Sequence, residues 1–411
     1  MNGQSRNRYD LSLLLISRAT RSFAAGFLAV IIGLYFTEAL HLSLTEVGIL
    51  FAAGGLGTPM LTLVFGRLAD IHGMKKLLLA SLILLPVSVV ILLVTTNYAL
   101  LIISSALGGF GIAGGLVGGG VGGSVAPMQT ALLAEKTDSE NRTTLFSVFT
   151  MISSFAGSAG ALMSNIENYR LLFLIALVIT AVSALAIIPL RENFRRRATG
   201  PKKEIQKDGN ASSNRKIIAK FAATGAMNGA AQGLITPFLS IILAETFLMP
   251  NGEIGDLFAI GGFLTSFVMI FTPILTKRMG FVPMIITTRS VSTVFLLAFP
   301  FASSALLASF FYVIFTSVRA LSLPSQQALM MNMVTEETRA SATGINQSSR
   351  LFPSAAASAS SGAIQDYISV VIPFEISFVL NVANLLMYYK FFWNEPAARS
   401  GHHAARVGFS E

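Results

Sequence analysis

Long uncharged apolar runs, separated by short polar links, recur almost from one end of this chain to the other. Runs of about 20 apolar residues are long enough to cross the hydrocarbon core of a bilayer as a helix. The first six runs cover residues 10–38, 46–67, 76–96, 98–134, 143–166 and 169–190. The next six cover residues 217–246, 254–276, 283–301, 303–334, 341–366 and 368–392. The pattern therefore predicts an all-α integral membrane protein with twelve transmembrane helices.

A polar stretch separates the two sets of six helices. Residues 191–216 are rich in Lys, Arg, Asn, Ser and Gly, which is typical of a solvated linker. We predict an N-terminal six-helix bundle over residues 1–190, a cytoplasmic linker over 191–216, a C-terminal bundle over 217–393 and a cytoplasmic tail over 394–411. The N-terminus has no pattern of a cleaved signal peptide, so we expect the first span to remain in the mature protein.

Basic residues lie in alternate links. The links on one side contain Arg67, Lys75, Lys76, Lys136, Arg142, Lys277, Arg278 and Arg339, together with the basic run of the linker. The links on the other side contain one basic residue, Arg170, and are acidic, with Glu38, Glu46, Glu167, Glu245, Glu253, Asp256 and Asp366. Positive residues remain on the cytoplasmic side of a membrane. We therefore expect a multi-pass cell (cytoplasmic or inner) membrane protein with both termini in the cytoplasm.

The composition agrees with a chain built for lipid and excludes several classes of function. Of the 411 residues 53% are hydrophobic and 12% are charged, against about 25% charged in soluble domains. The net charge of +9 is not gathered on a basic face with aromatics, so we expect no nucleic-acid partner. The chain has no cysteine, and its four histidines lie in links or in the tail. We expect no enzyme activity, no cofactor and no metal site.

The two halves are related in sequence. The segment TEVGILFAAGG (45–55) matches GEIGDLFAIGG (252–262) at an offset of 207. The segment PMQTALLAEKTDSENR (127–142) matches PSQQALMMNMVTEETR (324–339) at an offset of 197, which pairs Gln129 with Gln326. Two parallel six-helix repeats are a transporter architecture, and its substrate site lies near the midplane where the halves face each other.

The stretch GRLADIHGMKK (66–76) resembles the signature loop between the second and third helices of the major facilitator superfamily. Gly66, Leu68, Ala69, Asp70, Gly73, Lys75 and Lys76 fit this pattern, whereas Ile71 and Met74 replace residues that are usually basic. The resemblance covers the whole chain and implies transport by alternating access. It also implies that Asp70 latches the cytoplasmic side through Arg142 or through the start of the eleventh helix near Arg339.

Gly66 and Gly73 can let helices approach closely and let the chain turn tightly. A plain tight turn with positive-inside residues is the alternative interpretation of this loop. A second glycine-rich stretch, from Gly108 to Ser124, predicts either close helix packing or a segment that bends.

Five arginines fall within the predicted spans, and none has an obvious deep carboxylate partner. They are Arg18, Arg21, Arg289, Arg319 and Arg350. At 1.5 Å per residue, Arg21, Arg319 and Arg350 lie near the middle of the bilayer, and Arg18 is one turn from Arg21. Arg289 is about 9 Å into its predicted helix, so we expect it to snorkel to the inner surface rather than to bind substrate.

A charge at the membrane centre costs several kcal/mol unless it has a partner or faces water. Guanidinium groups bind carboxylates and phosphates in paired hydrogen bonds, so these arginines favour an anionic substrate. Alternatively, they could cap backbone carbonyls or bind neighbouring polar side chains. The amide side chains of Asn228, Gln232 and Asn346 could likewise hold substrate or join helices. The predicted substrate site comprises Arg21, Arg319, Arg350, Arg18, Asn228, Gln232 and Asn346.

We therefore predict a secondary active or facilitative transporter that moves a small organic anion through a central cavity between the halves. The expected partners are this small-molecule substrate, a coupling proton or counter-anion, and the lipid bilayer, with the protein as a monomer. The alternative is a proton-coupled efflux antiporter for drugs and other amphipathic compounds. Against it, the segment FAGSAGALM (155–163) lacks the Gly-Pro motif that such exchangers carry in their fifth helix.

Overall fold

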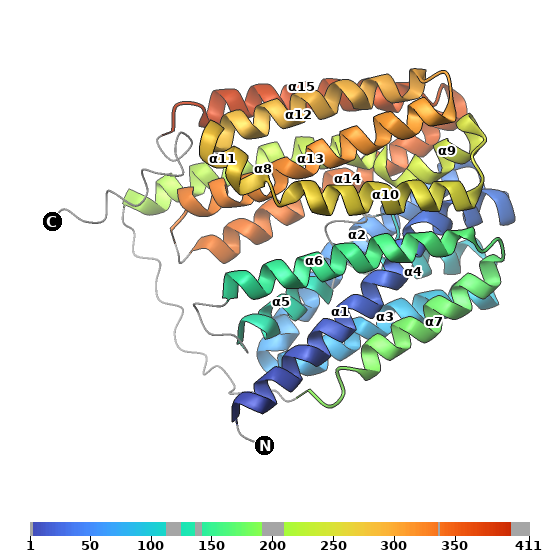
Figure 1. The fold of residues 1–411 in the computed structure, drawn as a ribbon, viewed down its shortest axis with the longest axis horizontal. Helices are drawn as coiled ribbons and strands as arrows, with labels where there is room; N and C mark the ends of the chain where they lie inside the picture. Colours follow the sequence, from blue (N-terminus) through green and yellow to red (C-terminus); the bar gives the residue numbers. More distant parts are fainter. Residues whose placement is uncertain (1–2, 112–124, 136–141, 191–208, 336–337, 396–411) are drawn as a thin grey trace.

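The computed structural model describes residues 3–111, 125–135, 142–190, 209–335 and 338–395, and these residues form helices joined by short links (Figure 1). The first half contains α1 (Gly3–Leu34), η1 (Tyr35–Ala39), α2 (Leu44–His72), α3 (Met74–Val94), α4 (Tyr98–Gly108), α5 (Ala126–Glu135), α6 (Arg142–Ala161), η3 (Leu162–Asn165) and α7 (Tyr169–Leu185). The second half contains α8 (Gly209–Gly233), η4 (Thr236–Phe238), α9 (Leu239–Phe247), α10 (Asn251–Met269), α11 (Thr272–Met279), α12 (Phe281–Ala298), η5 (Phe299–Phe301), α13 (Ala305–Met333), α14 (Arg339–Tyr367) and α15 (Ile372–Phe392).

These helices agree with the predicted spans, but three spans are interrupted. The span predicted for residues 98–134 is interrupted, because α4 ends at Gly108 and the next residue, Gly109, has a φ of 64°, which agrees with the bend expected as one alternative for the glycine-rich stretch. The span predicted for residues 254–276 breaks between α10 and α11, just before Pro273. The span predicted for residues 217–246 breaks at η4, which contains Pro237. Glycine ends helices by adopting positive φ, and proline removes a backbone donor.

The last part of the predicted linker is helical. Residues 209–216 of the predicted linker belong to α8. The rest of the linker (191–208), most of the tail (396–411) and most of the glycine-rich stretch (112–124) lie outside the described residues. Among the described helices, eight spans are long and apolar enough to cross a membrane, and α4 and α7 are shorter apolar helices.

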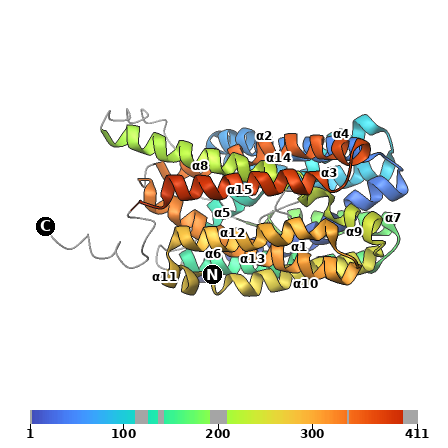
Figure 2. The ribbon, with the colours of Figure 1, turned by 90° about the horizontal axis from the view of Figure 1, so that it is seen from above.

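The helices pack in the same way in both halves, as two parallel repeats should. The first helix of each half packs on the fifth, as α1 on α6 and α8 on α14. The third packs on the sixth, as α3 on α7 and α12 on α15, and the second packs on the fourth. Figure 1 shows the two bundles side by side, and Figure 2 shows their helices running roughly parallel, with the start of α8 extending beyond the rest.

Glycines explain the tight contact between the first and fifth helices. A Cβ atom at Gly26 would overlap the backbone oxygen of Gly157, and one at Gly160 would overlap that of Phe23. In the second half, a Cβ at Gly229 would overlap the backbone oxygen of Arg350. Small residues allow this close approach of backbones within a membrane, and both repeats use them at the equivalent helix pair.

The halves join at the end of the molecule that carries the predicted outer links, which we call the acidic face (Glu38, Glu46, Asp256 and Asp366). We call the opposite end, where α1 begins and α15 ends, the termini face (Figure 1). At the acidic face the Asp366 carboxylate accepts hydrogen bonds from the backbone N–H groups of Leu44 (3.0 Å) and Thr45 (2.6 Å) across the interface. Asn165 donates to Asp256 at 2.9 Å, and Asn251 donates to Glu38 at 3.1 Å.

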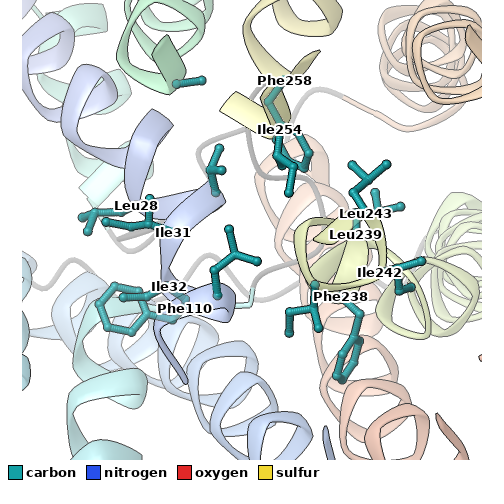
Figure 3. Packing of buried hydrophobic residues seen from close by; sticks show 14 of the residues in the cluster. Leu28, Ile31, Ile32, Phe110, Phe238, Leu239, Ile242, Leu243, Ile254 and Phe258 are labelled. Carbon is teal, nitrogen blue, oxygen red and sulfur yellow. The ribbon is translucent and has the colours of Figure 1, made fainter. Parts of the chain in front are cut away.

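The hydrophobic core follows the same division. One cluster joins both halves towards the acidic face, and Figure 3 shows Leu28, Ile31 and Ile32 of α1 opposite residues of η4, α9 and α10. Ring centroids of Phe51 and Phe238 lie 5.4 Å apart across this interface. Separate clusters around Leu78 in the first half and Ile285 in the second pack each bundle towards the termini face. The structure is therefore that of a state closed at the acidic face.

Candidate substrate-binding site

Arg319 of α13 is held by three amide side chains from two neighbouring helices. Its Nη2 donates to Asn228 Oδ1 at 2.5 Å, and its Nη1 donates to Asn381 Oδ1 at 3.4 Å. With the Gln232 amide oriented so that its oxygen faces Arg319, that oxygen accepts from Nη2 at 2.7 Å and from Nε at 2.6 Å. The sequence-predicted residues Arg319, Asn228 and Gln232 therefore meet in one group, which we call the Arg319 layer together with Asn381.

Arg289 of α12 occupies a second group, and its expected position at the membrane surface is wrong. Its side chain is 2% exposed, and its Nε and Nη1 donate to Ser322 Oγ (3.1 Å) and Asn384 Oδ1 (2.7 Å). Nη2 donates to Gln326 Oε1, and Cζ lies 5.0 Å from the centroid of the Tyr388 ring. Arg289 stays inside because neutral acceptors from α13 and α15 reach it at its own depth. We call Arg289, Ser322, Gln326 and Asn384 the Arg289 layer.

Arg350 and Asn346 are one turn apart on α14, and each has a buried polar atom with no partner among the described residues. These atoms are Nε of Arg350 and Oδ1 of Asn346. Gly225 of α8 leaves room for the Asn346 amide, because a Cβ there would lie 2.8 Å from Oδ1. Arg289 and Arg350 both lie close enough to Arg319 to act on its charge. The C-terminal half thus gathers three positive charges.

The N-terminal half contains the other two predicted arginines, on successive turns of α1. Arg18 is 7% exposed, donates to Gln129 Oε1 at 3.5 Å, and places Cζ 5.1 Å from the centroid of the Phe149 ring. Gln129 in turn donates to Ser17 Oγ at 3.3 Å. Arg21 is 3% exposed and close enough to Arg18 for their charges to interact. The structure therefore buries both arginines, and within the part of the chain that it describes Arg18 makes fewer hydrogen bonds than Arg289 or Arg319.

The described hydrogen bonds of Arg18, Arg289 and Arg319 all end on neutral oxygens. Amide and hydroxyl oxygens satisfy guanidinium donors, but they leave the positive charge uncompensated. A buried charge without a counter-charge is costly, and an anion is the group that would neutralise it. The arrangement can therefore bind a carboxylate or phosphate group. Among the described residues, no group of acidic and histidine side chains could hold a metal ion.

The predicted latch residues have mixed outcomes. Gly73 follows α2 with a φ of 94°, a conformation that favours glycine, so the expected tight turn is confirmed. In this state, which is closed at the opposite end, a Cβ at Gly66 would meet nothing within 4 Å, so the expected close approach at Gly66 stays a prediction. The side chains of Asp70, Arg142 and Arg339 lie outside the described part of the structure, so their latch role remains a prediction.

The predicted substrate site lacks five members of the two layers: Arg289, Ser322, Gln326, Asn381 and Asn384. A signal for two of them was present, because Asn381 and Asn384 lie three residues apart within an otherwise apolar helix, and such spacing places both on one face. Arg289 was left out because its shallow position in the predicted helix was the only criterion applied to it. That helix was also predicted to begin at residue 283, two residues after the observed start of α12 at Phe281.

A family model described as Major Facilitator Superfamily matches residues 14–224 and 221–410 of this chain. A search of curated protein sequences finds no match.

Solved structures with a similar fold include several transporters. A D-xylose-proton symporter aligns with a TM-score of 0.76 and 14% sequence identity, over 93% of this chain and 96% of that chain. The inward-open xylose transporter XylE from E. coli aligns with a TM-score of 0.71 and 13% identity, over 93% and 95% of the two chains. The human organic anion transporter MFSD10 aligns with a TM-score of 0.63 and 13% identity, over 93% and 99%. At these identities the similarity concerns the fold.

Proposed function

Because this chain belongs to the major facilitator superfamily, we propose that it moves a small organic anion across a membrane by alternating access between its two halves. The family consists of membrane transporters, so the open question is the substrate. The observation that carries the proposal is the Arg319 layer, in which a guanidinium group at the middle of α13 is held by three neutral amides. Such a group is fixed in position, and its charge is not neutralised.

Arg350 strengthens this proposal. It lies close enough to Arg319 for their charges to repel, and its Nε has no partner among the described residues. A carboxylate or phosphate bound near both side chains would relieve this repulsion and accept a hydrogen bond from Nε of Arg350. We place Arg21, Arg18 and Asn346 at the same site, as groups that meet the substrate from α1 and α14.

Alternating access requires that the two halves move relative to each other, and the described contacts support this. The halves are joined at the acidic face, while towards the termini face each half has its own hydrophobic cluster. We propose that the bundles of residues 1–190 and 217–393 rock about the site. We also propose that the protein lies in the cell membrane as a monomer, with the termini face in the cytoplasm, because Lys75, Lys76, Lys277 and Arg278 lie at that end.

A ligand screen on the purified protein tests the substrate class. In detergent, mono- and dicarboxylates and sugar phosphates are compared with cationic and neutral amphiphiles by thermal shift, since a ligand specific for the folded state raises its melting temperature. We expect anions to stabilise the wild type, and we expect the effect to disappear in Arg319→Gln and in Arg21→Gln. Arg278→Gln is the matched control, because it removes an exposed arginine at the termini face.

The screen also separates the two candidate functions. Uptake of a stabilising anion into proteoliposomes, lost in Arg319→Gln and kept in Arg278→Gln, would establish transport of that substrate class. Stabilisation by cationic or neutral amphiphiles that survives both changes would contradict the anion proposal. That result would favour the alternative, an efflux antiporter for amphipathic compounds.

A further inference from the structure

Arg289 bonds to residues of α13 that lie one and two turns beyond Arg319 towards the termini face, and all three kinds of its nitrogen atoms donate hydrogen bonds. Nε, Nη1 and Nη2 donate to Ser322, Asn384 and Gln326, respectively. Together with the stacked Tyr388 ring, these acceptors leave the side chain 2% exposed. A guanidinium that is enclosed and engaged in this way has little left to offer a ligand, so its role differs from that of Arg319.

The Arg289 layer joins the same three helices that build the Arg319 layer. Ser322 is three residues after Arg319 on α13, and Asn384 is three residues after Asn381 on α15, which in each case is about one turn. On α8, the Asn384 amide donates to the backbone oxygen of Thr224 at 2.7 Å, and Thr224 is one turn before Asn228. Ser322 Oγ also donates to the backbone oxygen of Arg319 at 2.8 Å.

We propose that Arg289 is a positioning residue for the substrate site: it fixes α8, α13 and α15 so that their amides hold the Arg319 guanidinium in one pose. This inference rests on the proposed binding of an anion at Arg319. An arginine side chain has many rotamers, and ordering it at the moment of binding would weaken affinity. A supporting layer that orders it beforehand therefore improves affinity without touching the substrate.

The first test removes the support in steps and measures the dissociation constant of the anion that stabilises the wild type most. We expect Arg289→Gln to weaken binding by about tenfold or more, since it leaves buried acceptors unpaired. We expect Ser322→Ala to weaken binding by about threefold, the effect of one hydrogen bond. Ser317→Ala is the matched control on the same helix, because this buried hydroxyl pairs with Thr265 of α10, at 3.3 Å, and belongs to neither layer.

A second background separates positioning from general damage. Arg319→Lys keeps a positive charge, but its three donors lie on one nitrogen and cannot reproduce the planar fork that spans the amides, so the Arg289 layer has less to position. In that background we expect Ser322→Ala to weaken anion binding by less than about twofold, the scatter of additive sites.

The outcomes separate a failure of the positioning role from a failure of the proposed function. If Ser322→Ala leaves the dissociation constant unchanged, or weakens binding by the same factor in wild type and in Arg319→Lys, the positioning role is wrong. The Ser322→Ala pair decides this even where Arg289→Gln does not fold. If the wild type binds no anion, the proposed function fails and takes this inference with it. If the wild type binds an anion but Arg289→Gln and Ser322→Ala bind it equally well, only the positioning role fails.

Discussion

The two halves share one helix packing but hold their buried arginines differently. Gln129 and Gln326 occupy equivalent positions in the repeats, and each accepts a hydrogen bond from an arginine. The donor is Arg18 of α1 in the first half and Arg289 of α12 in the second. Both halves therefore pair this glutamine with an arginine, but the arginine comes from the first helix in one half and from the third helix in the other.

The number and length of the hydrogen bonds also differ. Arg289 donates to three side chains and Arg319 to three amides, whereas the described bond of Arg18 is a single one of 3.5 Å. A side chain with few and long hydrogen bonds loses less hydrogen-bond free energy when it reorients. We infer that the C-terminal half presents a fixed binding group, whereas Arg18 of the N-terminal half can adjust during the transport cycle. Four predictions test how the two halves differ, what they share and how they hold each other.

The largest expected effect is on substrate binding. Arg319→Gln should weaken anion binding by about 30-fold or more, because removing one partner of a desolvated charge pair costs about 2 kcal/mol or more. Arg18→Gln should weaken binding by less than about tenfold, since Arg18 is held by fewer bonds. Both dissociation constants are measured by calorimetry on the purified protein. A larger loss for Arg18→Gln would reverse the assignment of the fixed half.

The second effect concerns the packing that the halves have in common. A Cβ at Gly229 or at Gly26 would overlap a backbone oxygen of the partner helix. We expect Gly229→Ala and Gly26→Ala each to destabilise the protein by about 1–3 kcal/mol, the usual result of overpacking, and to lower the melting temperature. Gly66→Ala is the control, because the space around it is open. If only one of the two substitutions is harmful, the repeats are less alike than their contacts indicate.

The third effect concerns the contacts by which the halves hold each other at the acidic face. Asp366→Ala removes the acceptor for the N–H groups of Leu44 and Thr45 and should weaken closure by about 1–2 kcal/mol. The chain has no cysteine, so Ala355→Cys, whose Cβ faces Gly55 of α2 across the interface, reports opening through its rate of maleimide labelling.

Labelling of Ala355→Cys should be about fivefold or more faster when Asp366→Ala is added. Glu375→Gln serves as the control, because it alters an exposed carboxylate of α15 at the same end of the molecule. Equal labelling rates with Asp366→Ala and with Glu375→Gln would show that the Asp366 contacts do not keep this face closed.

The smallest effect sharpens the contrast between the two glutamines. Gln129→Glu gives Arg18 an anionic partner and should raise the stability of the folded state by up to about 1 kcal/mol, because this long hydrogen bond becomes charge-assisted. The same change should weaken anion binding by about twofold to threefold, since it lowers the positive charge of the site. Melting temperature and dissociation constant are measured together. Tighter anion binding in this variant would place Arg18 outside the site.

Much of this protein can be predicted from its sequence, because the relevant signals are local. Apolar runs of membrane-spanning length predict the helices, the charges of the links predict their direction, and the repeat at Gln129 and Gln326 predicts two equivalent bundles. The candidate arginines were also visible, since a charge within an apolar run is conspicuous whatever the fold.

The tertiary structure decided which polar groups meet. It brings Asn228, Gln232 and Asn381 from two helices to Arg319, and it gives Arg289 three acceptors that keep it inside. Hydrogen bonds depend on which faces of distant helices touch, to within a fraction of an ångström. Spacing along one helix contains no such information. For the same physical reason, the closure of the acidic face by Asp366 and the open space at Gly66 could be read only from the packed helices.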